Sequence, residues 1–486
     1  MMRRSTLPAG MSLLPLMAIG AGAFEESASA QGPICFREYS RRNIAMSPQA
    51  IVVRDFNNNG SLDAAVVSLL EGGVSLSLND GSGVFRSGGF YPCGSDPWNL
   101  AAADFNGDGF LDLAVINGGF WTSATFTILL NDREGGFTQI GEIPSGGDTA
   151  YSVAAGDLNG DGKIDLVAAH DDGIVGLHFG RGDGTFETPQ LFLGPERPYA
   201  VAIANLDNQS HADLLITSRT HASVVSYFNN GDGSFTQQQE IIIGGWPRKI
   251  LTGDLNQDGD VDIVVLAVPS DTIIVLINDG AGFLEHRFTY SIGSYDGDLG
   301  DLNGDGIIDY AGVDSWLVRL ETLTGTGDGK FRPELPYRPF GNPTCVALGD
   351  LDSDGDVDAA VIIDTPYYYG RLLTLVGSGC RPLIAVSSRC PDGGSGNVSW
   401  SGAAPSGSLA VLLGMREGSF RIPGGFACSG TYLGLDRAGL RLVTVGNSDA
   451  RGSGSFTANI PPSACGLPIQ VLNLEHCLPS EVLIID

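Results

Sequence analysis

Short apolar stretches, whose residues often alternate with polar or small ones, recur along most of this chain of 486 residues. The segments Val74-Ser-Leu-Ser-Leu78 and Thr272-Ile-Ile-Val-Leu-Ile277 are rich in the aliphatic and β-branched residues that favour strands. Turns rich in glycine, asparagine and aspartate separate these stretches, as expected between antiparallel strands. The pattern therefore predicts an all-β protein.

The strands are grouped by a repeat of 47 to 53 residues. Each repeat has an acidic nine-residue loop between its first two strands and an N-x-G-D-G-x-F turn between its last two, and the clearest loop runs from Asp157 to Asp165. The seven loops begin at Asp55, Asp104, Asp157, Asn205, Asp254, Asp301 and Asp350. Because four antiparallel strands with tight turns form one propeller blade, the repeats predict a seven-bladed β-propeller.

The first and last repeats are expected to share a blade. After the seventh loop the third strand ends near Cys380, and no fourth strand of this pattern follows. At the other end, Phe36 lies 19 residues before Asp55, just as Phe85 lies 19 residues before Asp104. We therefore expect the segment after Phe36 to complete blade seven, which would close the ring without leaving a sheet edge exposed.

Three regions follow from the limits of the repeat. Residues 1–30 contain two arginines, an apolar stretch and the cleavage-like sequence Ala28-Ser29-Ala30, which predicts a secretory signal peptide. Residues 31–380 form the predicted propeller. Residues 381–486 are rich in glycine, serine and proline and contain alternating apolar runs, so we expect a small C-terminal β-sandwich module. The mature protein is expected to be secreted or at the cell surface, with no membrane span.

Eight cysteines in an exported chain permit disulfides. Cys35 and Cys380 would meet where the ring closes, so a disulfide across this seam is one possibility. The other is that Cys380 pairs within the C-terminal region. Cys93 and Cys345 have no evident partner. No C-x-x-C pair occurs, which argues against a zinc or thioredoxin-like site.

The charge of the chain indicates cations rather than anionic partners. The net charge of −29 argues against nucleic acid or an anionic membrane surface. Positions 1, 3, 5 and 9 of the seven loops together contain 20 carboxylates. Much of the acidity is therefore concentrated in the loops, as expected for a set of cation sites.

The loops have the composition of Ca²⁺ sites, since Ca²⁺ prefers six to eight oxygen ligands. Positions 1, 3, 5 and 9 supply side-chain oxygens, and glycine at position 6 allows a sharp turn. The opening is similar to an EF-hand loop, but position 12 lies in a strand. The predicted ligands are Asp55, Asn57, Asn59, Asp63, Asp104, Asn106, Asp108, Asp112, Asp157, Asn159, Asp161, Asp165, Asp254, Asn256, Asp258, Asp262, Asp301, Asn303, Asp305, Asp309, Asp350, Asp352, Asp354 and Asp358.

The seven loops are not equivalent. Loop one has two carboxylates among its four ligand positions, which predicts weaker binding. Loop four has Asn205, Asp207, Gln209 and Asp213 at the ligand positions and Ser210 in place of glycine, so we expect it to bind no metal. The alternative for all the loops is that side-chain-to-backbone hydrogen bonds stabilise them as turns without metal.

These repeats resemble the FG-GAP or VCBS repeats of integrin α-subunit propellers and of many exported bacterial proteins. The resemblance covers roughly residues 36–380, and the integrin-type loops use the same positions 1, 3, 5 and 9. It implies a seven-bladed propeller with calcium on one face and a partner on the other. It implies no enzyme activity.

Two features bear on the site of function. Tyr295-Asp296-Gly-Asp298 forms an unusual inner strand of blade six, whose carboxylates either line a solvated channel or serve cation binding or acid–base chemistry. Aromatic residues are expected on the face opposite the loops, where they either pack between blades or form a patch for a sugar or a protein. These aromatic residues are Phe90, Tyr91, Trp98, Phe120, Trp121, Tyr367, Tyr368 and Tyr369.

The leading hypothesis is a non-catalytic, monomeric adhesion or interaction module that binds an extracellular protein or glycan. The six histidines show no metalloprotease spacing, and the chain has no nucleophile elbow or phosphate loop. The alternative is a carbohydrate-active enzyme, similar to a polysaccharide lyase, on a calcium-stabilised propeller.

Overall fold

The computed structural model describes residues 34–377, except residues 35, 119–122, 269–271, 335, 340 and 365–368, and beyond them the backbone of nine short strands. The chain divides into Met1–Gln31 and Gly32–Asp486, and the predicted signal peptide lies outside the described residues. In the part that is described, no helix is long and apolar enough to cross a membrane.

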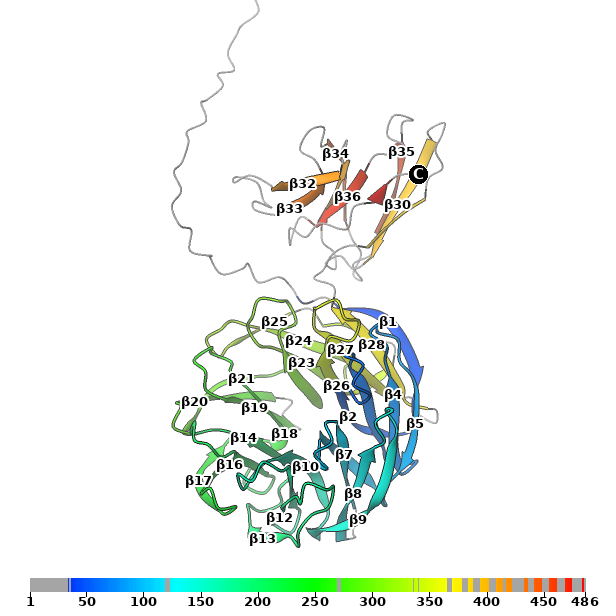
Figure 1. Cartoon of the computed structure of the whole chain (residues 1–486). Helices are drawn as coiled ribbons and strands as arrows, with labels where there is room; N and C mark the ends of the chain where they lie inside the picture. Colours follow the sequence, from blue (N-terminus) through cyan, green and yellow to red (C-terminus); the bar gives the residue numbers. More distant parts are fainter. Residues whose placement is uncertain are drawn as a thin grey trace, which may run out of the picture. The chain divides into compact units, whose positions relative to one another are not determined.

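Seven four-stranded antiparallel sheets are arranged around a centre, with the first strand of each blade innermost (Figure 1). This confirms the predicted seven-bladed propeller. The first six blades are β2 (Pro48–Arg54), β3 (Asp63–Ser68), β4 (Gly73–Leu78) and β5 (Arg86–Pro92); β6 (Pro97–Ala103), β7 (Asp112–Asn117), β8 (Ser123–Asn131) and β9 (Phe137–Asp148); β10 (Ala150–Gly156), β11 (Asp165–His170), β12 (Ile174–His178) and β13 (Gln190–Leu193); β14 (Val201–Ala204), β15 (Asp213–Ser218), β16 (Ser223–Asn229) and β17 (Phe235–Ile242); β18 (Trp246–Gly253), β19 (Asp262–Val268), β20 (Thr272–Asn278) and β21 (Leu284–Tyr290); β22 (Asp296–Gly300), β23 (Asp309–Asp314), β24 (Arg319–Gly325) and β25 (Phe331–Pro333).

Blade seven contains both ends of the propeller, as the sequence predicts. It consists of β26 (Asn342–Gly349), β27 (Asp358–Asp364), β28 (Arg371–Gly377) and β1 (Phe36–Asn43). Strand β1 pairs antiparallel with β28 along its length, and Ser40 and Thr374 share a side-chain hydrogen bond of 2.9 Å across this seam. Cys93 and Cys345 are free, whereas Cys35 and Cys380 lie outside the described residues.

The core lies between the blades. In the described part of the chain, seven hydrophobic clusters fill the seven interfaces between neighbouring blades. Every residue of β3 is buried, because its two faces pack against different neighbours. For example, Val66 of β3 belongs to the cluster that contains Ile362 of β27. Since each blade is buried on both sides, the ring is a rigid support for residues at its two ends.

Beyond the propeller, nine strands form three sheets with the orders β29-β30-β35, β34-β31-β36-β37 and β32-β33. The predicted β-sandwich of residues 381–486 stays a prediction, because the packing between these sheets is not described. The strands are β29 (Leu383–Ser387), β30 (Gly394–Ser401), β31 (Ser408–Leu413), β32 (Glu417–Arg421), β33 (Tyr432–Leu435), β34 (Arg441–Asn447), β35 (Gly454–Ile460), β36 (Pro468–Asn473) and β37 (Leu483–Ile484).

Candidate functional site

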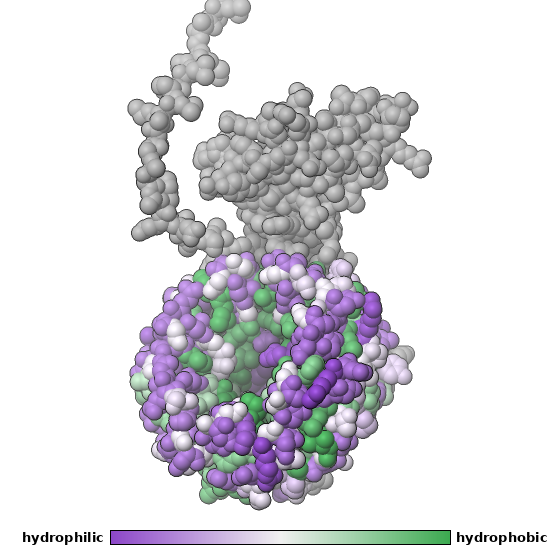
Figure 2. Space-filling model, viewed as in Figure 1, coloured by the Kyte–Doolittle hydropathy of each residue, from purple (hydrophilic) through white to green (hydrophobic). Residues whose placement is uncertain are grey.

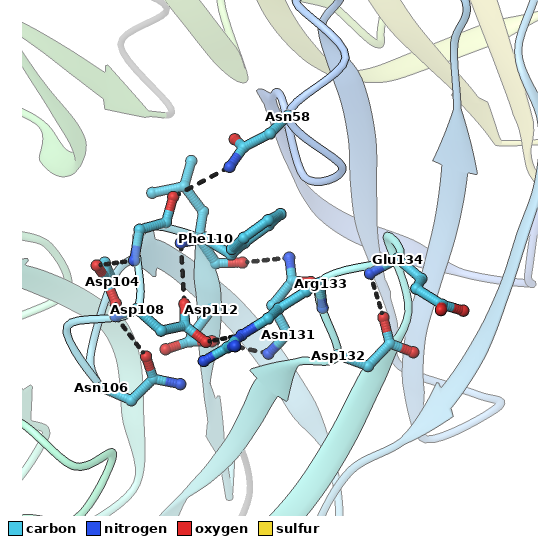
Figure 3. A network of polar contacts seen from close by, with 12 residues as sticks. Asn58, Asp104, Asn106, Asp108, Phe110, Asp112, Asn131, Asp132, Arg133 and Glu134 are labelled. Carbon is cyan, nitrogen blue, oxygen red and sulfur yellow. Dashed lines mark hydrogen bonds and ion pairs between the residues drawn. The ribbon is translucent and has the colours of Figure 1, made fainter.

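All 24 predicted calcium ligands lie in the loops between the first and second strands of their blades, with the ninth position opening the second strand. Loop two, drawn in Figure 3, shows the common geometry. Asp104 Oδ1 accepts the Asp108 N–H at 3.1 Å, and Asp104 Oδ2 accepts the Gly109 N–H at 2.8 Å. Asn106 Oδ1 also accepts the Asp108 N–H, at 2.9 Å. The side chains at positions 1 and 3 therefore accept hydrogen bonds from backbone N–H groups of the same loop, and these bonds hold the loop in a tight turn.

An asparagine of the N-x-G-D-G-x-F turn links four of these loops to the next blade. Asn131 Nδ2 donates to the Leu111 carbonyl of its own loop at 2.9 Å and to the Phe56 carbonyl of loop one at 2.7 Å. Equivalent bonds to the preceding loop are made by Asn79, Asn229 and Asn278. The motif's first residue thus has a structural role, which is to link neighbouring loops.

The ninth-position aspartates are buried, and burial raises their pKa values. The pKa rises to about 6 for Asp112, although the N–H groups of Asn131 and Phe105 favour its charged form. In loop seven the Asp358 pKa rises to about 7, again through burial and against two backbone donors. A nearby cation would favour the ionised form of such carboxylates.

Loops six and seven fit a calcium ion best. In loop seven, one carboxylate oxygen each of Asp350, Asp352 and Asp358 lie within 4.8 Å of one another. Asp352 Oδ1 is buried and has no hydrogen-bond partner in the described structure, and the same is true of Asp305 Oδ2 in loop six. Because a buried carboxylate oxygen without a partner is costly, and because these donor sets consist of oxygens, both loops suit a hard cation.

In other loops a protein group already contacts the fifth-position carboxylate. Arg133 Nε lies 3.0 Å from Asp108 Oδ2 in loop two (Figure 3), and Lys163 Nζ lies 3.1 Å from Asp161 Oδ2 in loop three. These positive charges would compete with a metal ion for the same oxygens. The loop sequences alone do not reveal the contact of Arg133, because this residue comes from the turn between β8 and β9, whereas Lys163 belongs to loop three itself.

Loop four does not fit a metal ion. Asn205 Nδ2 donates to the Gln209 carbonyl at 2.7 Å, and Gln209 Nε2 donates to Asp207 Oδ2 at 2.9 Å. Amide donors therefore occupy the loop at positions where other loops have carboxylates. That loop four binds no metal stays a prediction, and these amide donors give it a physical reason.

A second candidate site lies on the channel axis, at the start of the inner strands. A recess with a volume of about 260 Å³ is lined by residues from all seven blades. Figure 2 shows from one side that the propeller is hollowed at its centre, with both hydrophobic and hydrophilic residues around the hollow. Seven lining residues share one repeat position, six residues before the acidic loop: Gln49, Trp98, Tyr151, Tyr199, Arg248, Tyr295 and Thr344.

Five of these seven side chains form a continuous arc around the recess. Trp98 meets Tyr151 edge to face at 5.5 Å between ring centroids. Tyr151 and Tyr199 are stacked, with centroids 4.7 Å apart and an interplanar angle of 17°. The Arg248 guanidinium carbon lies 3.5 Å from the Tyr295 centroid and 5.4 Å from that of Tyr199. The arc therefore combines aromatic faces with one cation.

The sequence analysis singled out only Trp98 and Tyr295 from this arc. Tyr151, Tyr199 and Arg248 were missed, because their residue types differ between blades and show no motif. The sequence does contain a signal for them, because each lies six residues before its acidic loop, as Trp98 does before loop two.

The carboxylates of blade six are tied to their neighbours rather than free in the channel. Asp296 Oδ1 lies 2.5 Å from Lys249 Nζ, and Asp296 Oδ2 accepts the Val346 N–H of β26 at 3.0 Å. Asp298 Oδ2 accepts the Leu348 N–H at 2.9 Å. Burial alone would lower the Lys249 pKa, but Asp296 and Asp298 outweigh burial, so this pKa is raised. These groups join blades five, six and seven.

The other predicted aromatic residues do not form one patch in the described structure. Tyr91 packs edge to face against Phe137, with 5.3 Å between centroids, at the interface of blades one and two. Phe90 is exposed on the outer strand β5, and Tyr369 is exposed after β27. The remaining four, Phe120, Trp121, Tyr367 and Tyr368, lie outside the described residues.

The seven repeated blades define a β-propeller built from sequence repeats. The model of the FG-GAP-like repeat matches residues 50–115, 119–168, 157–216, 205–265, 254–311 and 301–361. The chain therefore belongs to the FG-GAP-like repeat family. No curated protein matches the chain.

Solved structures show the same architecture. BBS1N, crystallised in complex with ARL6DN and soaked with lead, matches with a TM-score of 0.53 and 10% identity over 72% of this chain and 98% of that chain. The mercury-soaked crystal of the same complex gives a TM-score of 0.51 at 10% identity over 70% and 97%. At such low identity the similarity supports the fold alone.

Proposed function

We propose that this protein is an exported, calcium-stabilised propeller that acts as a non-catalytic interaction module and binds an extracellular protein or glycan in the channel recess. The observation that carries the proposal is the arc of aromatic and cationic side chains around that recess. FG-GAP propellers are generally interaction modules, and BBS1N was crystallised with a protein, ARL6DN.

The recess has the properties of a binding site. Aromatic side chains offer a large contact area and lose little conformational entropy when a ligand binds. The arc residues are half-buried and belong to strands, or lie next to them, so their positions are fixed by the ring. A concave site with a few polar groups among aromatic ones is the usual form of a ligand pocket.

Calcium has a supporting role in this proposal. Asp301, Asn303, Asp305 and Asp309 would hold an ion in loop six, and the equivalent four aspartates would hold one in loop seven. The ion would supply positive charge to carboxylates that otherwise repel one another. Because the ion would bind the folded loops only, it would stabilise the propeller without taking part in ligand binding.

The test is ligand binding to the secreted form, measured on an array of glycans and extracellular proteins. The Tyr151→Ala/Tyr199→Ala variant should lose binding, because it removes the stacked pair of the arc. Phe283→Ala is the matched control, since Phe283 is an exposed aromatic residue outside the recess. Equal binding by both variants would place the ligand elsewhere, and release of products from a bound polysaccharide would favour the enzyme alternative.

A further inference from the structure

The channel recess differs in charge from the rest of the molecule. The chain as a whole carries a net charge of −29, yet two cations, Arg248 and Lys249, line the recess and only one carboxylate, Asp296, is among its lining residues. Arg219 lies beside it, with its guanidinium carbon 5.3 Å from the ring centroids of both Tyr199 and Trp246. Positive charge is thus concentrated at one place in an acidic protein, which indicates an anionic ligand.

The cations of the recess are not equally available. Lys249 is paired with Asp296 at 2.5 Å. Arg248 and Arg219, by contrast, contact aromatic rings and form no ion pair with a carboxylate among the described residues. Arg248 is therefore the lining cation that pairs with no carboxylate in the described part of the chain.

Arg248 has more hydrogen-bond donors than its contact with Tyr295 uses, because a guanidinium has five N–H groups and Tyr295 offers one hydroxyl. A guanidinium that stacks on an aromatic ring uses its face, whereas its N–H donors point outward in its plane. Those donors match the two oxygens of a carboxylate in a bidentate arrangement. Stacking on Tyr295 also orders the Arg248 side chain before a ligand arrives, which reduces the entropy cost of binding.

We propose that the recess binds a carboxylate-bearing sugar, such as a hexuronic acid residue of an acidic glycan. Arg248 would bind the carboxylate, and the exposed ring surfaces of Trp98, Tyr151 and Tyr199 would pack against the sugar ring. The amides of Gln49 and Asn99, which also line the recess, would bind sugar hydroxyls. This inference rests on the proposed function and names its ligand class.

The size and lining of the recess favour a sugar over a protein partner. Its volume of about 260 Å³ is slightly below the range of about 300–1,000 Å³ that is usual for drug-sized ligands. It therefore suits one or two sugar rings. A stable protein partner would need an interface of about 800 Å² on each side. An acidic peptide that inserts one side chain would use the carboxylate site but not the polar lining around it.

The test compares ligands that differ only in charge. Oligogalacturonate and its methyl ester are titrated into the secreted protein by calorimetry, and polyglutamate serves as the acidic-peptide probe. We expect the acid to bind about 10- to 100-fold more tightly than the ester, as for a hydrogen-bonded ion pair. Arg248→Gln should remove this difference, whereas Arg287→Gln, which changes an exposed arginine outside the recess, should not.

A further control separates the recess from the calcium loops, because uronates themselves bind Ca²⁺. Oligogalacturonate affinity should be the same at two free Ca²⁺ concentrations at which the protein stays folded, and an affinity that rises with calcium would overturn the assignment to Arg248. Thermal melting of each variant confirms that it is folded, and Arg248→Lys, which keeps the charge but not the bidentate geometry, should bind with intermediate affinity.

Two outcomes distinguish this inference from the proposed function. If acid and ester bind equally and both depend on Tyr199, the module binds glycans but the carboxylate selectivity is wrong. If polyglutamate binds more tightly than oligogalacturonate, the proposed ligand class is wrong. The same follows if a protein binds and no glycan does. In both cases the proposal that the protein is an interaction module still holds. If no glycan or protein on the array binds, the proposed function fails with it.

Discussion

At the scale of the residue, individual polar side chains hold neighbouring blades together. Asn131 illustrates this, because its amide donates to carbonyls of two different blades in a buried position. The contact joins residues that are 75 positions apart in the sequence. Such a side chain stabilises the ring without belonging to the hydrophobic core.

Replacing Asn131 with alanine should lower the free energy of unfolding by about 2 kcal/mol, because one buried and one partly buried carbonyl lose their donor. Chemical denaturation would measure the change. Asn230→Ala is the matched control, since Asn230 is exposed and donates to the nearby Ser234 hydroxyl. Equal stability of the two variants would show that the link between blades contributes little.

A buried histidine pair should make stability depend on pH. Burial lowers the pKa values of His170 and His178 below the ordinary 6.5, and it outweighs their hydrogen bonds to the Ile174 and Ser145 carbonyls. As the pH falls below 6.5, the unfolded chain takes up protons that the folded protein does not bind. The stability that these two histidines contribute should therefore fall on acidification, by up to about 1.4 kcal/mol per pH unit for each histidine, whereas the buried aspartates with raised pKa values contribute in the opposite direction.

The measurement is the difference in melting temperature between pH 7.5 and 5.5. The His170→Gln/His178→Gln variant should lose less stability on acidification than the parent protein does. His286→Gln is the control, because His286 is exposed on β21. The explanation would be wrong if the double variant kept the full pH dependence.

At the scale of the element, the loops that look alike in sequence differ in what surrounds them. Loops six and seven have buried carboxylate oxygens that lack a hydrogen-bond partner among the described residues, whereas Arg133 contacts the fifth-position carboxylate of loop two. In loop four, amide donors replace carboxylates. The capacity to bind calcium should therefore follow the environment of each loop as well as its motif.

Calcium should raise the melting temperature, and a chelator should lower it. When the free calcium concentration is 100 times the dissociation constant of a site, that site adds about 2.7 kcal/mol to the free energy of unfolding. Asp305→Asn and Asp352→Asn should each reduce the effect of calcium, because each changes a carboxylate whose buried oxygen has no other partner. Gln209→Ala in loop four should leave it unchanged. A melting temperature that does not respond to chelation would contradict the calcium sites.

Loop two offers a test of competition between a side chain and a metal. Arg133→Gln should raise the calcium affinity of this loop, because Arg133 Nε no longer contacts Asp108 Oδ2. Calorimetric titration of the variant would detect one site with increased affinity. Lys330→Gln is a control, since Lys330 pairs with Asp328 in a turn outside the acidic loops. If the calcium affinities of the variant equalled those of the parent protein, the contact of Arg133 with Asp108 would not compete with calcium.

The sequence predicted elements better than it predicted the functional site, for a physical reason. The repeat period is imposed on every blade by the same strand and turn geometry, so seven copies reinforce one another, and even the seam at Phe36 was predicted. The arc of Trp98, Tyr151, Tyr199 and Arg248 is different, because each blade supplies one residue and the residue type varies around the ring. These residues come together only when the ring closes, so no local sequence pattern predicts that they are neighbours.

At the scale of the whole molecule, closure of the ring depends on β1. This strand pairs with β28 in blade seven, and it also contacts blade one, where Arg42 donates to the Leu76 carbonyl at 3.1 Å. Ser40 Oγ donates to the Gly83 carbonyl at 2.9 Å. The strand therefore joins the first blade to the last.

A chain that begins at Ile44 should lack this closure and expose the edge of β28. Unpaired strand edges associate with other chains, so we expect soluble aggregates or a lower melting temperature. Light scattering and thermal melting would measure both, with a chain that begins at Gly32 as the control. A stable monomer lacking β1 would show that the interfaces between blades are sufficient.

The seam also determines when the propeller can finish folding. Ser40 and Thr374, which bond across it, are 334 residues apart in the chain. At about 5–20 residues per second, roughly 15 to 70 seconds of synthesis separate the two residues. Strand β1 is thus made early and paired last, and contacts between such distant residues form slowly. Until blade seven is made, every nascent chain carries an unpaired first strand, so the ring cannot close while its blades are still being translated.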